Sequence, residues 1–149
     1  MTQGRPASPR WLIPPVYFAV ALALMGFFHV AAPVARVIFV PYRYAGLVIA
    51  ALAIAFGAWA AWTLHRAGTP LHPFDEPRAL VTAGPYQHSR NPMYLAMAGT
   101  LLGAALYLGS ITPFLVLPAF MAVITDRFIR DEEQRLRAAF GAAYEAYQA

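Results

Sequence analysis

Three long runs of residues without Asp, Glu, Lys or Arg dominate this sequence. They cover residues 11–35, 44–65 and 91–125. A helix that crosses a membrane needs about 20 apolar residues, so each of the first two runs fits one span. The third run has 35 residues, and as a single helix it would be roughly 52 Å long. That is far more than the ~30 Å hydrocarbon core of a bilayer, so we expect it to form two spans.

Turn-forming residues mark the point where the third run is expected to fold back. They are Gly109, Ser110, Thr112 and Pro113. The sequence therefore predicts an all-α integral membrane protein, with about four transmembrane helices in a single domain over 1–149. We expect spans at about 12–34, 44–65, 92–108 and 111–126, followed by a cytoplasmic amphipathic C-terminal helix over 127–147.

Composition supports this fold class and excludes others. Hydrophobic residues make up 60% of the chain and charged residues only 12%, where a soluble domain has about 25% charged residues. Cysteine is absent, which excludes disulfides, a thiolate metal site and a cysteine nucleophile. We expect no metal site. The net charge is +4, but the basic residues are scattered between apolar runs, so nucleic acid is not an expected partner.

The distribution of arginines predicts the orientation in the membrane. With four spans, nine arginines lie on the side of the amino terminus, the second loop and the tail, and only Arg36 and Arg43 lie on the other side. Positive residues are enriched in cytoplasmic segments. The sequence therefore predicts a protein of the bacterial-type inner membrane whose amino and carboxyl termini are both cytoplasmic.

The acidic residues are confined to the second half of the chain. There are seven, and none precedes Asp75. The first two spans therefore hold no carboxylate, which disfavours a small proton-coupled transporter, because such a protein needs an ionisable group near the bilayer midplane. His29 is the ionisable side chain available there. A lone histidine on an apolar helix, however, is more often packed against a backbone carbonyl. A non-catalytic membrane scaffold remains the other alternative.

The second loop, residues 71–91, is expected to pack on the membrane face. Its prolines and Gly84 forbid a regular helix, yet it is not a polar linker. The loop ends at Asn91-Pro92, which predicts an asparagine cap and a proline at the first position of the third span. The free N–H groups of such a helix start can hold a carboxylate or phosphate. An ordinary helix start is the alternative interpretation.

The tail carries a pair of carboxylates beside an apolar stripe. The stripe has helical spacing and consists of Ile129, Leu136, Phe140, Tyr144 and Tyr147. Glu132 and Glu133 fall on or next to it, where a carboxylate is costly unless it is paired. Either an arginine such as Arg90 or Arg127 forms a structural bridge with them, or they face a cationic ligand. Because the fourth span reaches only about 22 Å, we expect its helix to continue through residues 126–134.

Two segments together resemble a known family. GPYQHSRNPMYL, followed after the hairpin by RDEEQRLRAAFGAAYEAY, is similar to the integral-membrane methyltransferases, which include isoprenylcysteine carboxyl methyltransferases and phospholipid N-methyltransferases. The resemblance covers residues 66–147. The shared pattern is LVT-x-G-P-Y, R-[HN]-P-x-Y, a Glu-Glu pair and F-G-x-x-Y-x-x-Y. Asn91 stands where the isoprenylcysteine enzymes have histidine, which leaves the acceptor open.

The resemblance implies methyl transfer from S-adenosylmethionine, bound at the cytoplasmic face in a pocket that is not a Rossmann domain. The residues that it implies for cofactor binding are Arg78, Ala79, Leu80, Val81, Tyr86, Asn91, Pro92, Met93, Tyr94 and Glu132, with Arg90 as a neighbour. The resemblance also implies a lipophilic or small acceptor, which we expect to be a prenylcysteine-type carboxylate, a phospholipid amine or a thiol. Two residues are catalytic candidates: we expect Glu133 to act as a general base if the acceptor is an amine, and Arg127 to hold an anionic acceptor at the membrane interface.

Overall fold

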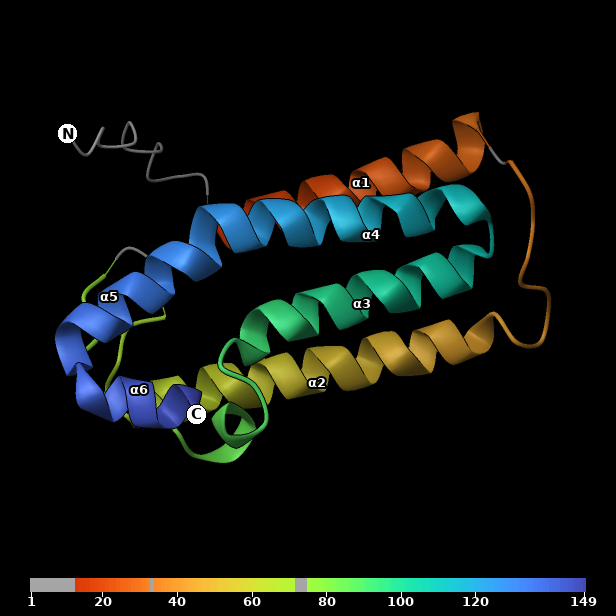
Figure 1. Ribbon diagram of the computed structural model, residues 1–149. Helices are drawn as coiled ribbons and strands as arrows, with labels where there is room; N and C mark the ends of the chain where they lie inside the picture. The colour runs from red at the N-terminus through yellow and green to blue at the C-terminus, as the bar shows by residue number, and fades with distance from the viewer. Residues whose placement is uncertain (1–12, 33, 72–74) are drawn as a thin grey trace, which may run out of the picture.

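The computed structural model describes residues 13–32, 34–71 and 75–149. Four apolar helices form the bundle: α1 (Pro14–Ala31), α2 (Tyr44–Arg66), α3 (Pro92–Leu108) and α4 (Ile111–Ile124). Figure 1 shows α1 lying along α4 and α2 lying along α3. Two shorter helices continue α4: η2 (Thr125–Ile129) and α5 (Arg130–Phe140). Two more are η1 (Gly84–Gln87), in the second loop, and α6 (Ala142–Gln148), at the end of the chain.

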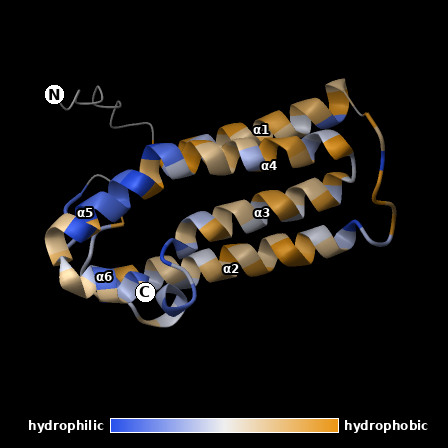
Figure 2. Ribbon diagram, viewed as in Figure 1, coloured by the Kyte–Doolittle hydropathy of each residue, from blue (hydrophilic) through white to orange (hydrophobic). Residues whose placement is uncertain are grey.

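The helices have the length and surface of membrane spans. α1, α2 and the continuous helix from Ile111 to Phe140 are long and apolar enough to cross a bilayer, and α3 is a shorter apolar helix. Large apolar side chains point outward, among them Phe27 at 62% exposure and Leu52 at 66%. A soluble monomer rarely exposes so much apolar surface. The predicted all-α membrane fold is confirmed, and in Figure 2 the hydrophilic residues gather mainly at one end, over α5.

Small residues bring α2 and α3 into backbone contact. A Cβ atom added to Gly103 would lie 2.5 Å from the carbonyl oxygen of Gly46 and 2.6 Å from the amide nitrogen of Ala50. Cβ atoms added to Gly57 and Gly99 would lie 2.8 Å and 2.9 Å from the Cβ atoms of Ala96 and Ala53. In a membrane the hydrophobic effect does not drive helices together, so close approach through small residues supplies much of the packing energy. α2 and α3 therefore form a tight pair.

The end of the bundle where α3 turns into α4, together with residues 34–43, is called the hairpin end. Gly109 has a φ of 78°, which a residue without Cβ adopts readily, and its carbonyl oxygen accepts hydrogen bonds from the N–H groups of Val37 and Ile38. The predicted hairpin is present. His29 Nδ1 lies 2.7 Å from Ser110 Oγ, so this packed histidine bonds a buried hydroxyl rather than the backbone carbonyl expected.

The fourth helix runs on beyond its apolar part, as expected. It passes through a π-helical turn, η2, and ends at Phe140. The tail, however, is not one helix over 127–147. Gly141 has a φ of 50°, far from the helical value of about −63°, so the chain turns there and α6 folds back. The predicted first span also shortens to Pro14–Ala31, and Arg5 and Arg10 lie outside the described residues.

Candidate functional site

A cavity of about 370 Å³ lies at the end of the bundle opposite the hairpin, and this end is called the cavity end. Its walls come from the starts of α1 and α3, the end of α2, the second loop, α5 and α6. Ligand pockets for small molecules span about 300–1,000 Å³. Ten residues implied by the family resemblance line it: Ala79, Leu80, Val81, Tyr86, Arg90, Asn91, Pro92, Met93, Tyr94 and Glu132.

Three other candidate residues do not line the cavity. The Arg78 side chain is exposed, although the Arg78 N–H donates to Thr69 Oγ1 at 3.2 Å. Arg127 is exposed in the π-helical turn. Glu133 points toward Arg90 instead. Neither catalytic candidate, Arg127 nor Glu133, lines the cavity itself, although Glu133 contacts the cavity-lining Arg90.

The centre of the site is a hydrogen bond between α3 and α5. The Tyr94 hydroxyl donates to Glu132 Oε2 at 3.0 Å across 38 positions of sequence. Tyr94 is almost fully buried and Glu132 is half-buried. Burial raises the pKa of the Glu132 carboxyl, and the hydrogen bond from Tyr94 and the charge of Arg135 partly oppose that rise. The carboxyl is therefore held against the cavity wall by a fixed donor.

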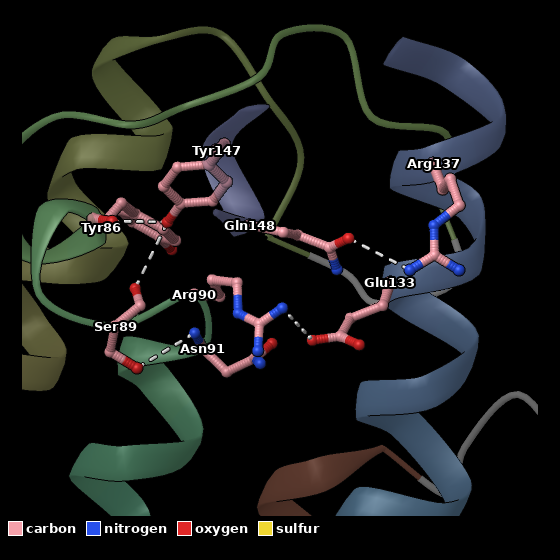
Figure 3. Close-up of polar contacts among 8 residues, drawn as sticks. All are labelled: Tyr86, Ser89, Arg90, Asn91, Glu133, Arg137, Tyr147 and Gln148. Atoms are coloured by element: carbon pink, nitrogen blue, oxygen red, sulfur yellow. Dashed lines mark hydrogen bonds and ion pairs between the residues drawn. The ribbon is translucent and has the colours of Figure 1, made fainter. Parts of the chain in front are cut away.

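The two glutamates divide the alternatives that the sequence left open. Glu133 Oε1 lies 3.5 Å from Arg90 Nη1, which is the structural bridge (Figure 3). The side chains of this pair are 25% and 45% exposed, and ion pairs this accessible add little stability. Glu132 instead lines the cavity, and the alternative that it faces a cationic ligand stays a prediction.

Helix α6 covers one side of the site. The Tyr147 hydroxyl donates to the Tyr86 carbonyl oxygen, and Arg137 Nη2 donates to Gln148 Oε1 at 3.1 Å (Figure 3). The side chain of Tyr144, a residue of this helix, is fully buried. Burial is the main cause of a raised pKa for the Tyr86 and Tyr147 hydroxyls, so both stay protonated at neutral pH. They remain hydrogen-bond donors there.

Several residues of the site were not predicted from the sequence. Thr69 Oγ1 accepts a hydrogen bond from the Ala79 N–H at 2.9 Å and fixes the segment that carries Leu80 and Val81. Arg135 lines the cavity, and its position three residues after Glu132 was a usable signal. Asn91 is the residue before α3 and Pro92 is the first of the helix, as expected, but the Asn91 side chain makes no capping hydrogen bond.

The cavity offers a defined set of chemical groups. A carboxyl and tyrosine rings suit a cation, arginines suit a carboxylate, and the remaining wall is largely apolar. Among the described residues no group of three or more His, Asp or Glu side chains is arranged so that it could hold a metal ion. The arrangement can bind a compact ligand that carries both charges and an apolar part.

The comparison with known families agrees with this arrangement. The model of the phospholipid methyltransferase family matches residues 42–143, which is more than half of the chain. No curated protein and no solved structure matches the chain. The matched range includes α2, α3, α4, α5 and the whole second loop. The chain therefore belongs to the phospholipid methyltransferase family and is an S-adenosylmethionine-dependent methyltransferase of the membrane.

Proposed function

We propose that the cavity binds S-adenosylmethionine and that the chain methylates a lipophilic acceptor at the cytoplasmic membrane face. One observation carries this proposal: a single cavity joins the loop and the tail that resemble the family, with the Tyr94–Glu132 bond at their junction. These segments lie 38 residues apart at that bond, and a scaffold has no need to bring them together around a cavity. Family members generally use this cofactor.

The residues present fit the cofactor. Bound there, it supplies a methyl group on a positively charged sulfur. Glu132 provides the opposite charge, and the rings of Tyr86 and Tyr94 provide aromatic faces for a cation. Leu80, Val81 and other apolar residues suit a flat base. The whole set lies at the polar end of the bundle, where a water-soluble cofactor can arrive.

The chain's own contribution is orientation and exclusion of water. Thr69 fixes the loop segment at 79–81, and the hydroxyl of Tyr94 fixes the carboxyl of Glu132. Tyr147 holds α6 against Tyr86. Holding reactants in a near-attack geometry supplies much of the acceleration available to a displacement reaction, and a closed pocket strengthens the charge interactions inside it.

An apolar groove next to the cavity supports a lipophilic acceptor. It has a volume of about 210 Å³ and shares Pro15, Met93 and Met97 with the cavity. Its other lining residues are Phe18, Ile54, Gly57, Ala96 and Thr100, from α1, α2 and α3. A hydrocarbon chain in this groove would bring its head group to the cavity directly from the bilayer. Because Arg127 and Glu133 lie outside the cavity, the proposal gives them no catalytic role.

The orientation rests on the arginines. The cavity end carries Arg66 and those of the second loop and tail, whereas the hairpin end carries Arg36 and Arg43. By the positive-inside rule the cavity end is cytoplasmic. A reporter fused after Ala149 should therefore read as cytoplasmic, and an external reading would contradict the proposed face.

The decisive experiment measures cofactor binding by the detergent-purified protein. Labelled S-adenosylmethionine should bind, and Glu132→Ala should weaken binding by about tenfold or more, because charge-assisted contacts contribute about 1.5–3 kcal/mol. Glu145→Ala removes an exposed carboxylate outside the cavity and should bind normally. Unchanged affinity in Glu132→Ala would reject this site. Mass spectrometry of membrane lipids with and without the protein should then identify the acceptor, as a species heavier by one methylene unit.

A further inference from the structure

Four charged side chains stand out among the described residues that line the cavity. They are Asp75, Arg90, Glu132 and Arg135. Arg90 is paired with Glu133 outside the cavity, and Asp75 lies in an exposed stretch of the loop. Glu132 and Arg135 are different, because both are half-buried and both lie on α5.

The spacing of these two residues places opposite charges one helical turn apart. Positions i and i+3 of a helix are neighbours on one face, and here that face lines the cavity. Arg135 acts electrostatically on the Glu132 carboxyl and lowers its pKa, against the effect of burial. It also acts on the Tyr94 hydroxyl, which is bonded to that carboxyl. α5 thus presents an anion and a cation to the same space.

A ligand that matches such a pair is itself a zwitterion, with a cationic centre close to an anionic one. Arginine offers a planar fork of N–H donors that a carboxylate accepts in two parallel hydrogen bonds. The amino-acid end of the methyl donor has this character, since it carries a carboxylate near its charged sulfur. The phosphate of a lipid head group is the other anion that could meet Arg135.

We propose that Arg135 binds the carboxylate of the methyl donor, while Glu132 lies beside its cationic part. The inference rests on the proposed function and deepens it, because it assigns the polar end of the donor to α5. Arg90 also lines the cavity, but it precedes α3 and its guanidinium lies 3.5 Å from Glu133, a residue outside the cavity (Figure 3). Under this assignment, α5 selects donors that retain their carboxylate.

The test compares two ligands on the full chain in detergent micelles. Equilibrium dialysis measures S-adenosylmethionine and its decarboxylated analogue, which keeps the sulfonium and the amine. The unmodified protein should prefer the carboxylated ligand by about tenfold or more. Arg135→Gln should remove this preference by weakening S-adenosylmethionine alone, and Arg135→Lys should restore part of it. Arg130→Gln changes an exposed arginine of the same helix that pairs with Asp126 and should leave both affinities unchanged.

The outcomes separate the inference from the function on which it rests. Equal weakening of both ligands by Arg135→Gln would mean that the residue supports the cavity wall, and would overturn the inference alone. So would an undiminished preference in that variant, the result expected if Arg135 serves a lipid phosphate. Normal binding of the analogue by Arg135→Gln shows that the variant is folded. Failure of the unmodified protein to bind either ligand would overturn the proposed function and this inference together.

Discussion

The two ends of the bundle use their polar residues in opposite ways. At the hairpin end, Ser110 is fully buried and lies 2.7 Å from His29 Nδ1, and Thr112 Oγ1 donates to the Ala32 carbonyl oxygen at 3.1 Å. At the cavity end, Glu132 accepts a hydrogen bond from Tyr94 but also faces open space. At the hairpin end the polar groups bond neighbouring segments to each other, whereas at the cavity end some of them face a cavity of ligand size.

This difference predicts that separate sets of residues determine the stability of the fold and the affinity for the ligand. Polar groups that bond neighbouring elements contribute to folding, whereas groups aimed into a cavity contribute to ligand binding. Substitutions at the hairpin end should therefore lower thermal stability and leave donor affinity per folded molecule unchanged. Substitutions at the cavity end should do the reverse.

The largest effect is expected at Gly103, near the hairpin end of α3. Gly103→Val should prevent accumulation of folded protein, because its Cβ would meet backbone atoms of α2 at 2.5 and 2.6 Å. Backbone cannot move aside as a side chain can, so the cost should exceed the ~3 kcal/mol at the upper end of ordinary overpacking. Gly26→Ala is the control, because nothing lies within 4 Å of that added Cβ. Size-exclusion profiles of both variants in detergent check the expectation, and a monodisperse Gly103→Val peak would contradict it.

The location of the helices was predictable because charge is costly in a bilayer. The uncharged runs and the turn at Gly109 were enough for the bundle and its hairpin. Gly141 was not recognisable as a helix end, because the stripe from Ile129 to Tyr147 keeps its spacing across it. A glycine within such a stripe is compatible with a continuous helix or with a break.

The residues of the site were more predictable than the directions in which the side chains of the tail face. The resemblance implied the loop residues and Glu132, and these meet around one cavity. It could not show that Arg135 lines the cavity and that Arg127 does not. The π-helical turn at Thr125–Ile129 holds an extra residue, and one residue rotates the following helical face by about 100°. A 3.6-residue period extrapolated from the fourth span therefore does not fix the face on which Arg127, inside that turn, lies.

A smaller effect on stability is expected at the His29–Ser110 bond. Ser110→Ala leaves the His29 ring without its partner hydroxyl, and loss of one partner of a buried bond costs about 1–3 kcal/mol. The melting temperature should fall, while S-adenosylmethionine affinity stays at the unmodified value. A double-mutant cycle with His29→Ala should give a coupling energy of about 1 kcal/mol. Additive effects would show that the two side chains do not act as a pair.

At the cavity end, Gly141→Ala should have a modest effect of the opposite kind. Its φ of 50° is strained for alanine, so the junction of α5 and α6 should lose about 1 kcal/mol. The loss should weaken the contact between Tyr147 and Tyr86 and lower donor affinity several-fold, with little change in melting temperature. Gly26→Ala again serves as control. A fall in melting temperature with normal affinity would place α6 among the purely structural elements.

The smallest effect concerns pH and the Glu132 carboxyl, which lies in α5, after the apolar part of its helix. Burial raises its pKa above the ordinary value of 4.5, so the folded protein binds this proton more tightly than the unfolded chain. The associated stability is fully present below 4.5 and is lost as pH rises through the folded pKa. The melting temperature of the ligand-free protein should fall over that range. Glu132→Gln should flatten the profile, and Glu145→Gln should not.

The same carboxyl should link pH to the choice of ligand. A sulfonium favours the ionised form of Glu132, whereas the demethylated thioether carries no such charge. The stabilisation that S-adenosylmethionine gives should therefore grow as pH rises through the folded pKa, relative to that given by S-adenosylhomocysteine. Glu132→Gln should abolish the difference in slope. Parallel profiles for the two ligands in the unmodified protein would mean that the sulfur lies away from Glu132, and that the cavity end uses this carboxyl, like Ser110 at the hairpin end, to hold helices together.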